Sequence, residues 1–233
     1  MSGKAPIGLD SYTYAQENFI QWGIPFSFIF RSRFALFFFS FILNHYVMTY
    51  RHLAGSHCIL DVGCGLGLPM RCLRHLGLRS KAIALDVSAK YLRRVVKLGI
   101  YNDYVLASAK YIPFKEKSFK SLMCLQVLEH LTKMDGVTAL KELSQVADLV
   151  IVTTPVGFVE ADANPINPFQ KHKSGWYPED LIYFGYKVRG YGWLRIKRFY
   201  RIIPILIILN FFFALIIQHV PRFAYYMYAI KTK

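Results

Sequence analysis

Short apolar runs alternate with longer segments of mixed polarity through the middle of the chain. Strand-like runs fall near 57–62, 82–86, 103–107, 121–127, 148–154 and 186–192, and Phe223 to Ile230 is a candidate for one more. Strands that alternate with helices form a mostly parallel sheet with helices on both faces, so this pattern predicts an α/β fold. Gly77 and Gly99 are placed to end the first two crossover helices.

Two segments are more apolar than this core pattern requires. Residues 24–48 are rich in Phe and Ile and are interrupted by Arg31 and Arg33. The most apolar stretch, 34–43, is too short to span a bilayer. We expect an N-terminal helix here, and both core packing and contact with a membrane fit it.

The second apolar segment, 202–218, carries no charge and lies at the lower limit of length for a spanning helix. Basic residues flank it on both sides: Arg195, Lys197, Arg198, Arg201, His219 and Arg222. A spanning helix would leave the last strand across the membrane, unable to pair with the strand at 186–192. We therefore favour a helix that dips into one leaflet or packs on the N-terminal helix, with its basic flank at lipid headgroups. A C-terminal tail anchor is the alternative.

The most specific motif is a glycine-rich turn after the first strand. Asp61, Gly63, Gly65 and Gly67 follow one another at alternate positions, and Asp86 ends the second strand about 20 residues later. Such a turn brings backbone N–H groups close to a ligand, and an acid at this offset binds ribose hydroxyls. Dinucleotide binders show G-x-G-x-x-G instead. An acid before the glycines repels phosphate and attracts an ammonium or sulfonium group.

This pattern resembles motif I of the class I S-adenosylmethionine (SAM)-dependent methyltransferases, in particular small type 11-like members. Later segments resemble the same family in the right order, including 104–114, 119–131 with its Leu-Glu-His-Leu end, 167–176 and 185–190. The resemblance covers roughly residues 55–192. It implies SAM as cofactor and a Rossmann-like sheet of seven strands, mostly parallel, with an antiparallel last strand. The N-terminal helix would cover the cofactor, and the apolar helical insertion would precede the last strand.

The resemblance also implies cofactor-binding residues, with Asp61 near the amino-acid end of SAM and Asp86 at its ribose. The full expected set is Asp61, Gly63, Cys64, Gly65, Gly67, Asp86, Val87, Ser108, Ala109 and Gln126. Two positions depart from the family pattern: Ser108 and Lys120 both stand where Asp is usual. A hydroxyl at position 108 still accepts a hydrogen bond from adenine, but without charge assistance.

Composition and charge indicate where in the cell the protein works. The chain has 233 residues, of which 54% are hydrophobic, and a formal net charge of +15. Excess cationic and aromatic surface favours an anionic membrane face over nucleic acid, since no basic run accompanies a known nucleic-acid motif. Solubility charge alone is the other explanation. Cys58, Cys64, Cys72 and Cys124 form no C-x-x-C pair and are expected as small buried thiols in a reducing, cytoplasmic compartment.

Residues that could act on the acceptor belong at the carboxyl ends of the strands. His172, in a polar loop, is the first candidate for a base, although His172, Ser174 and Trp176 could instead only anchor the next helix. His130 is the second candidate and could equally be structural. Glu160 and Asp162 are solvated acids or acceptor contacts. No metal-ligand constellation is evident in the sequence.

These observations predict two units, an N-terminal helical cap over 1–54 and a methyltransferase domain over 55–233 with a hydrophobic insertion at 200–220. We expect an enzyme that methylates a small-molecule or lipid-like acceptor at the cytoplasmic face of a membrane, without a nucleic-acid partner. Two other hypotheses stay open: a soluble small-molecule methyltransferase, and a degenerate SAM-binding scaffold at a membrane.

Overall fold

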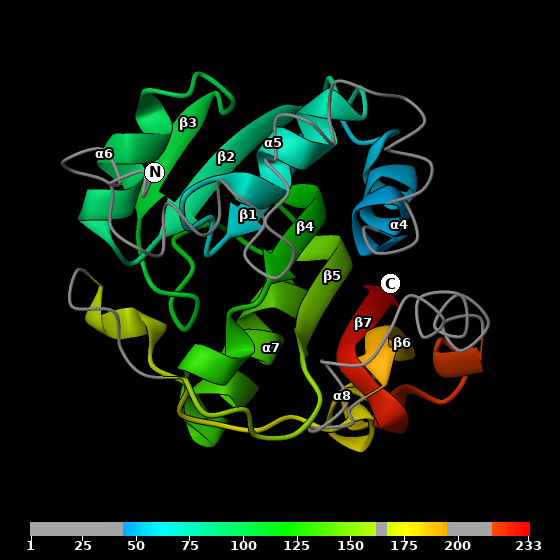
Figure 1. The fold of residues 1–233 in the computed structure, drawn as a ribbon. Helices are drawn as coiled ribbons and strands as arrows, with labels where there is room; N and C mark the ends of the chain where they lie inside the picture. Colours follow the sequence, from blue (N-terminus) through cyan, green and yellow to red (C-terminus); the bar gives the residue numbers. More distant parts are fainter. Residues whose placement is uncertain (1–43, 162–166, 195–215) are drawn as a thin grey trace, which may run out of the picture.

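The described part of the chain is built around one mixed β-sheet. The structure is a computed structural model, and it describes residues 44–161, 167–194 and 216–233 (Figure 1). Within these ranges seven strands follow the order β3-β2-β1-β4-β5-β7-β6. Their bounds are β1 (Cys58–Val62), β2 (Lys81–Asp86), β3 (Asp103–Leu106), β4 (Phe119–Leu125), β5 (Ala147–Pro155), β6 (Lys187–Leu194) and β7 (Ala224–Thr232).

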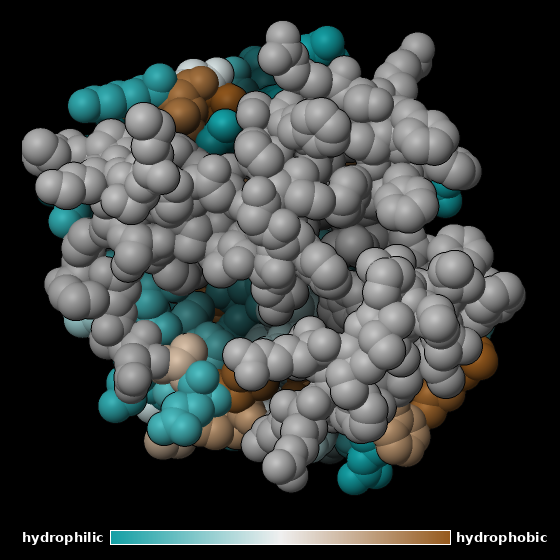
Figure 2. Space-filling model, viewed as in Figure 1, coloured by the Kyte–Doolittle hydropathy of each residue, from teal (hydrophilic) through white to brown (hydrophobic). Residues whose placement is uncertain are grey.

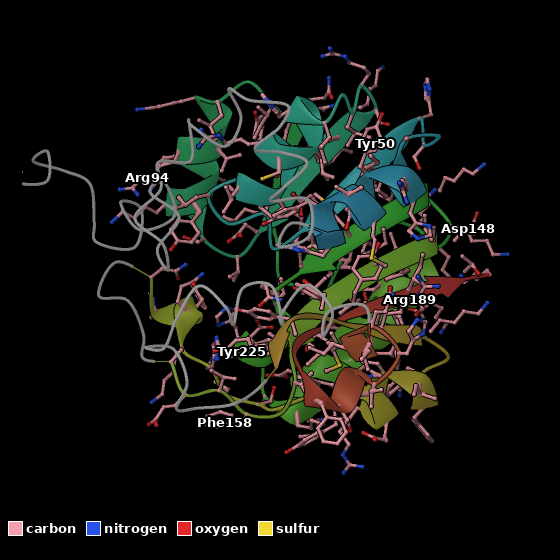
Figure 3. The ribbon with its side chains drawn as sticks, turned by 45° about the vertical axis from the view of Figure 1, so that its right-hand side comes forward. Tyr50, Arg94, Asp148, Phe158, Arg189 and Tyr225 are labelled. Carbon is pink, nitrogen blue, oxygen red and sulfur yellow. The ribbon has the colours of Figure 1, made fainter. Side chains whose placement is uncertain are left out.

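Strands β1 to β5 are parallel, and β7 lies antiparallel between β5 and β6. Figure 3 shows this reversal. Phe158, just beyond β5, and Tyr225, at the start of β7, lie at one end of the sheet, whereas Asp148, at the start of β5, lies at the other. The carboxyl ends of β1, β2, β4 and β5 therefore share one edge, where ligands bind in open α/β sheets.

Helices cover both faces of the sheet. Buried residues of α4, α5 and α6 pack with one set of strand side chains, which includes Ile59 and Met123. Residues of α7 and α8 pack with the opposite set, which includes Leu60 and Leu122. Successive residues of β1 and β4 are thus buried on opposite faces, as expected for strands inside a parallel sheet. The helices are α4 (Asn44–Leu53), α5 (Leu68–His75), α6 (Ala89–Val96), α7 (Lys133–Val146) and α8 (Pro178–Tyr183), with short 3₁₀ turns η1 (Leu128–His130), η2 (Pro168–Gln170) and η3 (Pro221–Phe223).

Local sequence fixes where several helices begin. The Ser88 hydroxyl accepts a hydrogen bond from Tyr91 N at the start of α6, and the Thr132 hydroxyl accepts one from Asp135 N at the start of α7. A proline occupies the first turn of α5 and of α8, where its missing N–H leaves no unpaired donor.

The structure confirms the predicted fold class, including the antiparallel β7. The predictions for 1–43, Asp162 and most of the insertion, 195–215, fall outside the described residues. In the described part of the chain, no helix has the length and apolar character needed to cross a membrane. Leu194 of β6 and Ala224 of β7 are register partners, so the chain returns to the same sheet after the insertion. This pairing is incompatible with the tail-anchor alternative, which requires a single crossing between them.

Candidate active site

The glycine turn after β1 is held against β2 by its own backbone. Gly63 N and Cys64 N both donate to Leu85 O, at 2.7 and 3.1 Å. Gly63, Gly65 and Gly67 have φ of 72°, 55° and 78°. These left-handed conformations are costly for residues with a Cβ, which explains the alternating glycines.

Gly63 and Gly65 are required for different reasons. A Cβ at Gly63 would collide with Val127 Cγ2, so this glycine permits close packing inside the protein. A Cβ at Gly65 would meet no protein atom within 4 Å, although Gly65 lines the cavity described below. The space beside Gly65 is therefore open to a ligand.

Asp86, at the end of β2, closes the turn. Its Oδ2 accepts a hydrogen bond from Gly65 N at 2.8 Å, and its Oδ1 accepts one from Ser88 N at 2.8 Å. Burial raises the pKa of this carboxyl group, while the backbone donors lower it. Asp86 is buried yet lines the cavity, and a carboxylate has about four acceptor sites, more than the backbone donors of Gly65, Val87 and Ser88 use.

Asp61 lies behind the turn and not in the cavity wall. The Tyr101 hydroxyl donates to its Oδ2 at 2.5 Å. Burial raises the pKa of Asp61 to about 7; the Tyr101 hydrogen bond lowers it, and the charge of Asp86 raises it further. Asp61 is thus a buried carboxyl group whose proton is lost near neutral pH.

A cavity of about 340 Å³ opens at the carboxyl edge of β1, β2 and β4. Part of its wall is formed by residues that the sequence assigned to the cofactor: Gly63, Gly65, Asp86, Val87, Ser108, Ala109 and Gln126. Another part comes from η1, the start of α7 and the loop after β5: His130, Leu131, Asp135, Asn167, Phe169, Gln170 and Lys173. One cavity therefore joins the expected cofactor residues to this second group of residues, which we call the second compartment.

Gln126 occupies a strained position at the end of β4, with φ of 57°. Non-glycine residues at positive φ persist only where surrounding contacts hold them. Here Gln126 N donates to Thr153 O at 2.8 Å, and its side-chain Nε2 donates to Thr153 Oγ1 at 3.1 Å and Tyr191 Oη at 3.3 Å. These contacts hold the Gln126 amide side chain in the cavity wall.

The loop of the second compartment is attached to η1 through buried polar contacts. Lys173 N and Ser174 N donate to Glu129 O, and Trp176 Nε1 donates to Leu128 O at 3.2 Å. Trp176 is fully buried beside Gly136 of α7. Ser174 and Trp176 thus anchor the loop to η1 and α7, whereas the sequence interpretation had them anchor the next helix.

His172 and His130 lie together beside this compartment. Their ring centroids are 4.9 Å apart in an edge-on arrangement. His172 Nδ1 lies 2.6 Å from Val159 O, and a carbonyl oxygen can only accept, so Nδ1 carries the proton. Burial lowers the pKa of His130 to about 4, which keeps it neutral.

Glu129 completes this group. Its Oε2 accepts a hydrogen bond from the buried Thr154 hydroxyl at 3.0 Å. Burial raises the pKa of Glu129 to about 8. Sequence reasoning placed these residues at the same edge of the sheet but did not connect them as one cluster, because His172 comes from a distant loop.

The structure brings most of the predicted site residues together. Asp61, Cys64 and Gly67 do not line the cavity; they support the turn from behind, and their cofactor role remains a prediction. His130 lines the cavity, and His172 contacts it only through the His130 ring. Sequence reasoning missed the pair formed by Lys110 and Asp135, whose Nζ and Oδ1 lie 3.1 Å apart in the cavity wall. The long sequence separation of these two residues gave no signal for it.

Comparison with known proteins shows what the central part of this chain is similar to. Residues 60–148 match the family model described as "Methyltransferase domain". The chain is 37% identical over 92 residues to a tRNA U34 carboxymethyltransferase from Nautilia profundicola, an alignment of 36% of this chain and 29% of that protein. It is 35% identical over 88 residues to a ubiquinone biosynthesis O-methyltransferase from Xanthomonas euvesicatoria, covering 36% of each. The chain thus spans about a third of the length of these curated relatives.

The solved structure of a SAM-dependent methyltransferase from Archaeoglobus fulgidus has the same fold, with a TM-score of 0.53 and 17% identity over 87% of this chain and 100% of that one. Residues 60–148 therefore resemble a methyltransferase domain, and the described part of the chain has the fold of SAM-dependent methyltransferases. The cofactor of this family is SAM, and the site fits it: the open space beside Gly65 and the cavity-facing Asp86 carboxylate lie at the carboxyl edge of the sheet.

Proposed function

We propose that this protein is a SAM-dependent methyltransferase whose cavity holds the cofactor at the glycine turn and the methyl acceptor beside η1. The observation that carries the proposal is the continuity of the cavity. Gly65 and Asp86 line the same cavity as His130 and Phe169. Methyl transfer requires the donor and the acceptor within about 3–3.5 Å in line, and one shared cavity supplies that proximity.

The chain's own residues would divide the work between cofactor and acceptor. Asp86 would accept hydrogen bonds from the ribose, Ser108 would contact adenine, and Asp61 behind the turn would favour the positive end of the cofactor. When bound, SAM supplies an electrophilic methyl group on a sulfonium. At the acceptor end, His130 lines the cavity and would be placed to take a proton from a hydroxyl acceptor, whereas His172, the first candidate from the sequence, would act only through the His130 ring.

We further propose a small-molecule or lipid-like acceptor and a working position at the cytoplasmic face of a membrane. Ile216 and Val220, at the end of the apolar insertion, and Phe223, just after it, have side chains exposed by 58, 40 and 61%. Figure 2 shows hydrophobic surface over the part of the molecule where Figure 1 places η3. This surface and the net charge of +15 suit an anionic lipid headgroup layer. One relative is named for tRNA, and our expectation of no nucleic-acid partner remains a prediction.

Calorimetry with SAM tests the cofactor assignment. We expect Asp86→Asn to weaken SAM binding by about 10- to 100-fold, because a neutral amide replaces a charged acceptor. Asp103→Asn is the matched control, since Asp103 is exposed at the opposite edge of the sheet. Equal SAM affinity in both folded variants would contradict the proposal.

The acceptor is identified by incubating the protein with methyl-labelled SAM and with separated membrane, lipid and soluble fractions. A labelled product in the lipid fraction is the expected result. Label only in the soluble fraction would favour the soluble small-molecule enzyme. SAM binding without labelled product in any fraction would favour the SAM-binding scaffold.

A further inference from the structure

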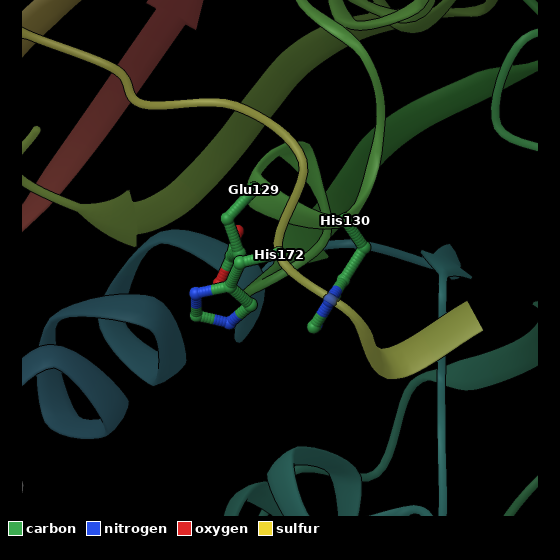
Figure 4. Close-up of side chains that lie close together, drawn as sticks. All are labelled: Glu129, His130 and His172. Carbon is green, nitrogen blue, oxygen red and sulfur yellow. The ribbon is translucent and has the colours of Figure 1, made fainter. Parts of the chain in front are cut away.

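Glu129, His130 and His172 form a compact group of side chains that can each ligate a metal ion. Figure 4 shows the three side chains gathered where η1 meets the loop after β5. One carboxylate oxygen and one nitrogen from each histidine lie within 4.8 Å of one another. Glu129 and His130 are adjacent on η1, and the anchored loop brings His172 to them.

Two of the three side chains are already oriented by a further hydrogen bond. Thr154 Oγ1 donates to Glu129 Oε2 at 3.0 Å. His172 Nδ1 donates to Val159 O at 2.6 Å, so Nε2 is the nitrogen available to ligate a metal ion. Hydrogen bonds from a ligand's remaining atoms to a hydroxyl or a backbone carbonyl are the usual support of protein metal sites.

The Nδ1 atom of His130 lacks a hydrogen-bond partner among the described residues, and a metal ion would bind it. This nitrogen is buried. Buried polar atoms are nearly always paired, so an orphaned imidazole nitrogen beside a carboxylate and a second imidazole calls for an explanation.

We propose that Glu129, His130 and His172 bind one first-row divalent metal ion of the zinc class. Two histidines and one carboxylate make a known ligand set for such ions, and three protein ligands leave a position open for water or substrate. Ligand bonds of about 2.0–2.1 Å would draw the donor atoms together from their present separation. Of the three ligands, His130 lines the cavity, so the metal ion would lie at the wall of the second compartment. An acceptor oxygen could occupy the open position, and this part of the inference rests on the proposed function.

A bound metal ion and a free histidine base exclude each other at this cluster, because both use the same imidazole lone pair. The metal site would therefore replace the histidine base by an ion that holds the acceptor oxygen directly.

The test is calorimetric titration of the chelator-treated full chain with Zn²⁺, and with Co²⁺ while recording its visible absorption, which intensifies in tetrahedral sites. We expect one ion per chain. Glu129→Gln and His172→Gln should each weaken binding at least about tenfold. Gln keeps the size of Glu129 and the Thr154 hydrogen bond, so this variant should fold. His57→Gln, an exposed histidine before β1 at the opposite edge of the sheet, is the matched control and should bind the ions unchanged.

Titration of the same samples with SAM separates the two proposals. SAM binding without metal binding would overturn the metal site alone, and metal binding without SAM binding would overturn the proposed function alone. Equal metal affinity in wild type, Glu129→Gln and His172→Gln would also overturn the site. That result would assign the ion to other residues, such as the cysteines.

Discussion

At Gly65, the backbone conformation that the turn requires can be tested separately from the open space that a ligand requires. Gly65→Ala and Gly99→Ala both place a Cβ at positive φ, 55° and 63°, and in both cases the Cβ meets no protein atom within 4 Å. Each should lose about 1–2 kcal/mol of unfolding free energy. Only Gly65→Ala should also weaken SAM binding, by about tenfold, because its methyl group enters the cavity wall. Denaturant unfolding and calorimetry measure both quantities; unchanged SAM affinity in Gly65→Ala would place the cofactor elsewhere.

Ser108 is the clearest departure from the family pattern, and the structure places it in the cavity wall. Ser108→Asp should tighten SAM binding by about fivefold or less, because a charged acceptor replaces a neutral one. Ser118→Asp adds the same charge at an exposed position outside the cavity and should leave the affinity unchanged. Calorimetry with SAM measures the affinity of both variants. Weaker binding in Ser108→Asp would show that residue 108 does not face adenine.

Asp61 gives the fold a defined pH dependence. Its pKa is about 7 in the folded protein and near 3.8 when unfolded. Between these values the folded state holds a proton that the unfolded state has lost, so this residue's contribution to the unfolding free energy falls as pH rises from about 4 to 7. Asp61→Asn removes this titration and can still accept the Tyr101 hydrogen bond.

The unfolding free energy of Asp61→Asn relative to wild type should therefore rise by roughly 2–4 kcal/mol across that window and stay level above it. Urea unfolding at a series of pH values measures the difference, in which titrations common to both proteins cancel. A flat difference across the window would mean that Asp61 is charged throughout.

The strands and crossover helices were predictable because their signals are local. The apolar runs gave all seven strands, and Gly77 and Gly99 lie at positive φ just beyond α5 and α6 as expected. The cofactor end of the site was predictable for the same reason, since its residues follow the ends of successive strands. The acceptor end was not, because it depends on long-range contacts such as those of Trp176 with η1 and α7.

Gly136 tests that long-range contact. A Cβ at this position of α7 would collide with the Trp176 ring. Overpacking costs typically about 1–3 kcal/mol, whereas alanine gains up to about 1 kcal/mol over glycine in a helix, so Gly136→Ala should be destabilising on balance. Thermal unfolding should show a lower Tm for Gly136→Ala than for Gly55→Ala, where a Cβ meets nothing within 4 Å. A Tm at or above that of wild type would mean that the loop adjusts freely.

Pairing of the chain's C-terminal strand with both β5 and β6 constrains how the whole molecule can meet a membrane. The insertion leaves from β6 and the chain returns to β7 in the same sheet. The boundary of the insertion also changes: Ile217 is buried in the core, and Gly190 N donates to Gln218 O at 3.3 Å. The removable segment therefore ends before residue 216, not at 218 as the sequence suggested.

Deleting 202–215 and joining the ends with a short Gly/Ser bridge should release the protein from anionic vesicles and leave SAM affinity within about twofold. The cofactor loops lie on β1, β2 and β4, whereas the insertion joins strands at the other end of the sheet. Co-sedimentation with anionic and with neutral vesicles measures the binding. For the full chain, raising the salt from about 0.05 to 0.5 M should loosen it partly, because screening removes the basic attraction but not apolar insertion.

Phe223→Ser tests the exposed apolar surface of Ile216, Val220 and Phe223 without a deletion. Phe223 is exposed by 61% and lies outside the core. This variant should reduce vesicle binding and leave Tm unchanged.

Equal sedimentation of the wild type, the deletion and Phe223→Ser would remove the membrane from the proposed function. A deletion that lost SAM binding as well would mean that the insertion contributes to the cofactor site. Binding that persists in the deletion at low salt but vanishes at high salt would assign membrane contact to surface charge alone.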